Sequence, residues 1–194
     1  MAKRDTSKTK DKIIEAAFDL FYNQGYQATT VDQVIEKSGV SRPTLYTHFS
    51  TKEDLCRAYL SERKTRDLTA FKEAMRRESN PRDRYLAVIR EVGKALWSTE
   101  YRGCGFFNII SEVADPAHPL FKEARRFVDD LRELIRDGVA ELKASDPRYE
   151  KLDVDQVAES YYVLVGGAIM VSQEYREKWP VERAIRAIEA LIES

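Results

Sequence analysis

One short segment of the chain, from Thr30 to Lys52, gathers residue types that suit contact with DNA; it reads TVDQVIEKSGVSRPTLYTHFSTK. Arginine can donate two parallel hydrogen bonds to guanine, and a proline ring or a threonine methyl can contact the methyl of thymine. Arg42, Pro43 and Thr44 offer these groups at consecutive positions, so we predict that they read bases. Hydroxyl, imidazole and ammonium groups suit phosphate oxygens. The predicted phosphate contacts are Thr30, Ser41, Tyr46, His48 and Lys52.

The charge of the chain is balanced overall but uneven locally. With 32 Lys+Arg against 33 Asp+Glu, the formal net charge is −1, which excludes a polybasic protein that coats nucleic acid. Between Lys37 and Lys52, however, three basic residues and one histidine occur without any acid. The N-terminal stretch adds further basic residues, which are Lys3, Arg4, Lys8, Lys10 and Lys12. A small positive window is typical of a protein that contacts DNA phosphates at a few points.

The local pattern predicts two short helices that would present these residues. Thr30 and Gln33 form a capping box at the start of the first, and Gly39 ends it. Ser41 can cap the second, with Pro43 in its first turn. Two short helices joined by a tight turn indicate a helix-turn-helix, whose second helix lies in the major groove with its N-terminal residues on the bases.

The surrounding sequence predicts an all-α protein. Apolar residues recur at helical spacing almost throughout, and no alternating stretch is long enough for a strand. A first helix is expected from near Thr9 to Gly25, and a second capping box, Ser50 with Glu53, is expected to open a long helix. We predict a three-helix DNA-binding domain over residues 1–52 and a larger helical domain over residues 53–194.

Two long helices in that second domain suggest self-association. They are expected over 117–143 and 153–178, and the latter is apolar on more faces than a single chain would cover. We therefore predict a homodimer in which both helices pack against their copies. The predicted interface residues are Phe127, Leu131, Tyr161, Leu164, Val165 and Ala168.

At this point the residues match a known pattern. Residues 13–55, IIEAAFDLFYNQGYQATTVDQVIEKSGVSRPTLYTHFSTKEDL, combine LFxxxGY, a T-T-V cap, G-V-S, L-Y-x-H-F and K-E-x-L. In this the chain resembles the TetR-type (TetR/AcrR) bacterial transcriptional regulators. One departure is Ile35, where the family usually has alanine, so the two motif helices are expected to pack at a slightly different angle.

The resemblance implies a homodimeric repressor that binds a near-palindromic operator and is released by a small molecule. It also implies a ligand pocket in the C-terminal domain. Aromatic residues at helical spacing there either pack the core or line that pocket. The pocket candidates are Trp97, Tyr101, Phe106, Phe107, Tyr162 and Met170.

Other classes of protein find little support in the sequence. We expect no catalytic residue, metal site or cofactor, because no nucleophile elbow, metal-ligand spacing or Gly-rich phosphate loop occurs. No apolar run reaches the length of a membrane span, the N-terminus lacks a signal peptide, and two isolated cysteines indicate the cytoplasm. The alternative is an all-α ligand-binding protein or an interaction adaptor with a degenerate helix-turn-helix, which would not bind DNA.

Overall fold

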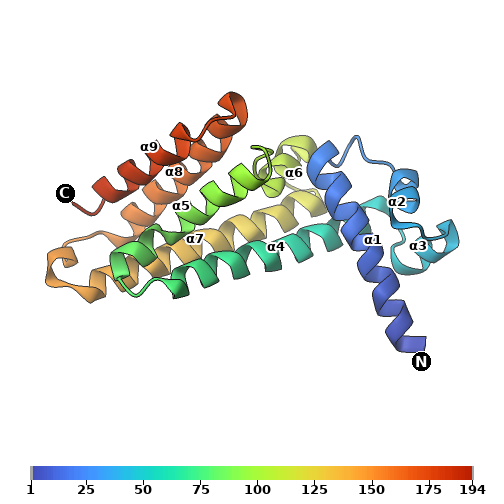
Figure 1. Ribbon diagram of the computed structural model, residues 1–194, viewed down its shortest axis with the longest axis horizontal. Coiled ribbons are helices and arrows are strands. Elements are labelled where there is room, and N and C mark those ends of the chain that lie inside the picture. Colours follow the sequence, from blue (N-terminus) through green and yellow to red (C-terminus); the bar gives the residue numbers. More distant parts are fainter. Residues whose placement is uncertain (1, 194) are drawn as a thin grey trace. The chain divides into compact units, whose positions relative to one another are not determined.

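The computed structural model describes the backbone of residues 2–193 and the side chains of residues 7–193. All regular elements in this range are helical, which confirms the predicted all-α class (Figure 1). Among the described residues, no helix combines the length and the apolar character that a membrane span requires. The elements are α1 (Ala2–Gln24), α2 (Val31–Ser38), α3 (Arg42–His48), α4 (Lys52–Arg77), α5 (Pro81–Ser98), α6 (Gly105–Val113), α7 (Pro119–Ser145), the 3-10 turn η1 (Pro147–Tyr149), α8 (Val154–Tyr175) and α9 (Trp179–Ala190).

Local capping signals fixed most helix boundaries as predicted. The backbone N–H of Gln33 donates to Thr30 Oγ1 at 3.3 Å, and the Thr30 N–H donates to Gln33 Oε1 at 2.8 Å, so this capping box is confirmed. Gly39 ends α2 in the left-handed conformation with φ 68°. The Ser41 side chain caps α3 by accepting from the Thr44 N–H. These caps satisfy backbone groups that a helix end would otherwise leave without partners.

Three boundaries differ from the prediction. Helix α1 begins at Ala2 rather than near Thr9. The cap of α4 is Thr51 rather than Ser50: Thr51 Oγ1 accepts from the Asp54 N–H at 3.0 Å and donates to its carboxylate at 2.9 Å. Ser50 with Glu53 and Thr51 with Asp54 both place an acid three residues after a hydroxyl, and the second pair forms the cap. Helix α8 ends at Tyr175 because Arg176 adopts a left-handed conformation, with φ 54°.

The chain divides into two compact units, and two long helices belong to both. The first unit contains the residues up to 65 together with 105–127, and the second contains 66–104 and the residues from 128 onward. The boundary therefore falls within α4 and within α7. The predicted division after residue 52 is one of function rather than compactness, and it stays a prediction.

The core of the first unit contains two aromatic residues for which the sequence suggested other roles. Phe106, a predicted pocket residue, is fully buried and stacks on Phe127, a predicted interface residue, with 3.8 Å between ring centroids and 8° between planes. A side chain enclosed in this way cannot contact a second chain, so the interface role of Phe127 is corrected. Phe106 is likewise a core residue.

The core of the second unit is formed by α5, α8 and α9. The Tyr161 hydroxyl donates to the Tyr85 carbonyl at 3.0 Å and accepts from the Ile89 N–H at 3.1 Å. The Tyr85 hydroxyl in turn donates to the Ile188 carbonyl at 3.0 Å. Tyr161 therefore ties α8 to α5 from within the core and is not an interface residue. The same correction applies to three more residues buried within one chain, Leu131, Val165 and Ala168.

We expect Tyr161→Phe to lower the free energy of unfolding by about 1–3 kcal/mol, because it leaves buried backbone groups of α5 without the hydroxyl that bonds them. Urea unfolding of the full chain, followed by circular dichroism at fixed protein concentration, measures this. Tyr175→Phe is the matched control, since Tyr175 is 59% exposed. Equal effects of the two substitutions would show that the buried hydroxyl contributes nothing.

Candidate nucleic-acid interface

The predicted helix-turn-helix is present as α2, a short turn and α3. Val34 on α2 and Leu45 on α3 are each 1% exposed, so each helix has one buried face. In the turn, the Gly39 N–H donates to the carbonyl of Ile35 at 3.0 Å. A β-carbon at Gly39 would meet nothing within 4 Å, so its positive φ, rather than lack of space, favours glycine there. The opposite face of α3 is left to solvent.

The first turn of α3 carries the three predicted base-reading residues. Arg42 and Pro43 are exposed and Thr44 is half-buried. Ser41 fixes this turn, since its Oγ accepts from the Thr44 N–H at 3.3 Å and lies 2.7 Å from Thr44 Oγ1. One turn further on, the Tyr46 ring is 45% exposed. The N-terminal end of α3 therefore presents the guanidinium, the proline ring and the phenol on a rigid, capped turn.

The basic residues of the positive window all have partners within the chain. Lys37 Nζ lies 2.6 Å from the carboxylate of Asp19 on α1. The guanidinium of Arg42 forms an ion pair with Asp32 on α2. The third, Lys52, is bound by backbone carbonyls. The sequence indicated an acid-free window along the chain, but the fold supplies acids from outside that window.

Lys52 holds the loop between α1 and α2. Its ammonium group donates to the carbonyls of Tyr26 at 3.0 Å and Thr29 at 3.1 Å, and lies 4.4 Å from the centroid of the Tyr26 ring. Two of its three donors are thus used inside the protein. Only the third N–H donor of Lys52 is left for the predicted phosphate contact.

A carboxylate from α6 holds the same loop from another side. Glu112 accepts from the Gln27 N–H at 2.8 Å. A β-carbon at Gly25 would lie 2.6 Å from that carboxylate, so glycine there permits the close approach as well as the φ of 95°. No local pattern in the sequence points to Glu112, because its partner Gln27 lies 85 residues away.

Electrostatics near this loop keep a neighbouring cysteine unreactive. Cys56 on α4 is fully buried. Burial raises the pKa of its thiol well above the usual value, and the charge of Glu112 raises it further. The thiolate is the nucleophilic form, so Cys56 is an inert core residue. Burial also raises the pKa of the Tyr26 phenol.

The remaining predicted contacts occupy different settings. The exposed Thr30 accepts from the Gln33 N–H in its capping box, and its hydroxyl lies 3.2 Å from Gln33 Oε1. His48 is half-buried, with its ring centroid 6.4 Å from that of Phe49. Lys10 Nζ lies 5.9 Å from the same Phe49 ring, which brings the basic start of α1 close to the end of α3. The side chains of Lys3 and Arg4 lie outside the described residues.

The predicted pocket residues differ widely in their exposure to solvent. Trp97 is 36% exposed and lies beneath Lys178, whose Nζ is 4.7 Å from the ring centroid. Tyr101, Phe107 and Tyr162 are half-buried. Met170 is 61% exposed, which is too much for the wall of an enclosed pocket and corrects that prediction.

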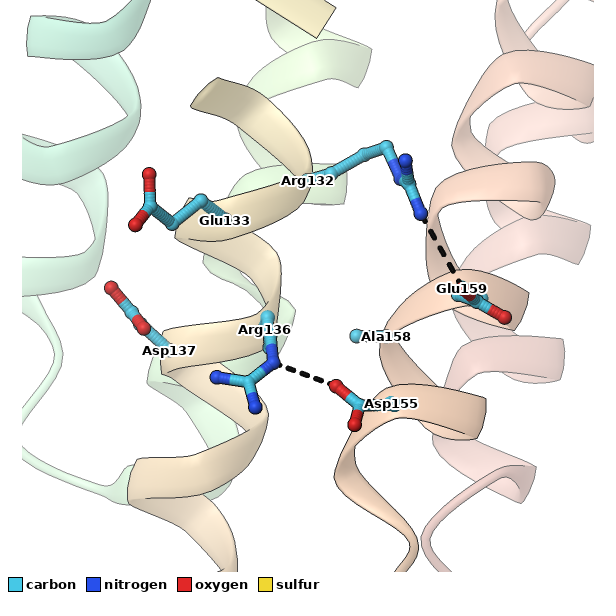
Figure 2. A pocket seen from close by; sticks show the side chains of 7 residues that line it. All are labelled: Arg132, Glu133, Arg136, Asp137, Asp155, Ala158 and Glu159. Carbon is cyan, nitrogen blue, oxygen red and sulfur yellow. Dashed lines mark hydrogen bonds and ion pairs between the residues drawn. The ribbon is translucent and has the colours of Figure 1, made fainter. Parts of the chain in front are cut away.

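One hollow between α7 and α8 is strongly charged. Figure 2 shows its two arginines on α7 facing two acids on α8: Arg136 Nε lies 2.6 Å from Asp155, and an Nη of Arg132 lies 3.4 Å from Glu159. Its volume is about 240 Å³. A lining of this kind does not suit an apolar ligand. None of the predicted pocket residues contributes to it; the lining residues are Arg132, Glu133, Arg136, Asp137, Asp155, Ala158 and Glu159.

Comparison with known families decides the identity of this helix-turn-helix. Residues 13–59 match the family model described as bacterial regulatory proteins, tetR family. Residues 82–188, more than half of the chain, match the model of the tetracyclin repressor-like C-terminal domain. The chain belongs to the TetR family. Proteins of this family are bacterial regulatory proteins, and this chain spans less than half the length of the first curated relatives that it matches.

Individual TetR relatives agree with this assignment. The transcriptional activator FasR of Mycolicibacterium smegmatis is 31% identical over 80 residues, which are 41% of this chain and 36% of FasR. The probable regulator ArpR of Pseudomonas putida is 28% identical over 86% of this chain and 81% of its own. A TetR-family regulator from Streptomyces coelicolor shares the fold with a TM-score of 0.87 at 23% identity, over 99% of this chain and 92% of that one.

Lys52→Ala tests whether this lysine acts as the clamp of the α1–α2 loop. We expect the free energy of unfolding without DNA to fall by about 1–3 kcal/mol, because two partly buried carbonyls lose a charged donor. Lys37→Ala is the matched control, since it removes only an exposed ion pair worth about 0–1 kcal/mol. Unchanged stability of Lys52→Ala together with weaker DNA binding would instead assign Lys52 to a phosphate alone.

Proposed function

We propose that this TetR-family regulator is a homodimeric repressor that binds a near-palindromic operator and is released by a small-molecule effector. The observation that carries the DNA-reading part is the first turn of α3. There Arg42 and Pro43 are exposed beside Thr44 on a turn capped by Ser41. In a helix-turn-helix this end of the second helix meets the base edges, so Arg42 reads a guanine while Pro43 and Thr44 contact a thymine methyl.

The phosphate contacts come from residues around that turn. Tyr46 extends from α3 into solvent, and Ser41 and Thr30 lie at the starts of α3 and α2. Helix N-termini favour anions because their first N–H groups point outward. His48 and the third donor of Lys52 complete the set. These contacts position the helix-turn-helix on the DNA without selecting a sequence.

An exposed apolar stripe on α8 supports a dimer. Val163 is 70% exposed and Met170 is 61% exposed, although both are apolar. They share one helix face with Gly167, where a β-carbon would meet nothing within 4 Å. Large apolar residues around a glycine suit close packing against the same stripe of a second copy. A two-fold dimer would place two α3 helices about one turn of DNA apart.

Repression and effector release are the further parts of the proposal. The relatives include both an activator, FasR, and a repressor, ComR of Escherichia coli, so kinship alone leaves the direction open. The match to a repressor-like C-terminal domain supports repression. Ser172 Oγ and Asn108 Nδ2 are buried without a hydrogen-bond partner among the described residues, and such atoms are available to a ligand. Because α4 belongs to both units, a ligand that shifts α4 would weaken DNA binding, typically by about 1–3 kcal/mol.

Arg42→Ala tests the base-reading assignment. We expect it to weaken discrimination at one base pair of each half-site by about 1–3 kcal/mol, because a bidentate contact with guanine is lost. Binding of the full chain to the operator and to its single-base variants measures this. Arg42→Lys keeps the charge but lacks the two-pronged geometry, so it should also lose discrimination. An equal loss on every duplex would reassign Arg42 to a phosphate.

Val163→Glu tests the interface. Two symmetry-related carboxylates at an apolar contact are costly to bury, so we expect the variant to be monomeric at micromolar concentration and to bind the operator weakly. Analytical ultracentrifugation gives the oligomeric state. Ala140→Glu is the control, because it places the same charge on an exposed residue of α7. Dissociation by Ala140→Glu but not by Val163→Glu would place the interface on α7 instead.

A further inference from the structure

An acidic residue that the sequence did not single out contacts the predicted base reader. Asp32 lies in the first turn of α2, and its Oδ1 accepts from Nη2 of Arg42, the first residue of α3. The ion pair thus joins the two helices of the motif, ten positions apart in the sequence. Both side chains remain mostly in solvent, with 70% of Asp32 and 56% of Arg42 exposed. A pair of this kind adds little to stability, so its effect has to be sought in binding.

The geometry of the guanidinium allows Arg42 to keep Asp32 while it reads a base. Arginine has five N–H donors, and Arg42 uses one of them, on Nη2, to bond Asp32. Guanine needs two of the donors that remain. The ion pair with Asp32 orients the planar guanidinium before DNA binds. The group therefore loses less rotational freedom when it contacts the base, as any positioned contact does.

The charge of Asp32 acts in the opposite direction on a phosphate contact. If Arg42 swings away to a phosphate, Asp32 is left as an unpaired carboxylate facing a polyanion. Lys37, the basic residue of α2, does not relieve this, because its ammonium group is paired with Asp19 on α1. Since binding to arbitrary DNA is made mainly of phosphate contacts, Asp32 penalises it more than binding to the operator.

We propose that Asp32 is a positioning residue for specificity: it holds Arg42 for a guanine and withholds it from phosphates. The proposal rests on the base-reading role of Arg42 stated above. It predicts that removing the charge at position 32 strengthens binding to random DNA but not to the operator, so that the ratio between them falls.

Asp32→Asn is the test, because it keeps the size of the side chain and alters an exposed position, so the variant should fold. We expect binding of the full chain to a random duplex to strengthen about two- to fivefold, with no gain on an operator selected by the wild type. The ratio falls by the same factor, and the preference for guanine at the Arg42 position falls with it. Fluorescence anisotropy with the two duplexes measures both affinities, and circular dichroism checks the fold.

Three further variants separate this role from a simple charge effect. Glu36→Gln removes an equal charge from α2 but does not alter the Asp32–Arg42 pair. It should therefore change the affinity for both duplexes by the same factor. In an Arg42→Ala background, Asp32→Asn should also act on both duplexes alike, since nothing remains to be positioned. Asp32→Glu should restore part of the ratio.

The outcomes distinguish this proposal from the proposed function. If the wild type selects an operator but Asp32→Asn keeps the wild-type ratio, or lowers it equally in the Arg42→Ala background, the positioning role is wrong while the regulator stands. If the wild type selects no sequence at all, the base-reading role is wrong and the positioning role falls with it.

Discussion

The attachment of the α1–α2 loop is the constraint on which the DNA-reading part of this protein depends. That loop directly precedes the helix-turn-helix, and it has no regular structure of its own to fix its course. Lys52, at the start of α4, bonds two of its carbonyls, and Glu112, on α6, bonds one of its N–H groups. The course of the loop that leads into α2 is therefore fixed by side chains from two other helices. A shift of α4 or α6 would reach the reading helices through charged hydrogen bonds rather than through loose chain.

The charge of the helix-turn-helix is also balanced by contacts within the protein. Each basic residue in the acid-free window has a partner within the protein, which explains how a chain with net charge −1 can carry a DNA-binding motif without a broad positive surface. In the proposed mode of binding, a few exposed groups and the helix ends contact the DNA, so geometry matters more than total charge. Arg42 illustrates this, because its partner Asp32 balances the charge while leaving donors directed to solvent.

Sequence patterns predicted those features that depend on residues a few positions apart. The caps at Thr30 and Ser41 followed from side chains that reach three residues along the chain. At α4 two such boxes overlapped, and only the fold showed which one forms. Helical periodicity placed Phe106, Phe127 and Tyr161 on apolar helix faces, but it could not show which residues cover those faces. It likewise could not show that Val163 and Met170 stay exposed, or bring Glu112 to a loop 85 residues away.

The most direct test of this account is a selection of random duplex DNA by the full-length wild-type protein. The account predicts enrichment of one near-palindromic sequence, with a guanine that Arg42 reads in each half-site and with half-site centres about one helical turn, roughly 10 base pairs, apart. Binding to that sequence should be far tighter than to random DNA at the same salt concentration. Recovery of no preferred sequence, or of a single half-site without symmetry, would contradict the claim that a pair of α3 helices reads the operator.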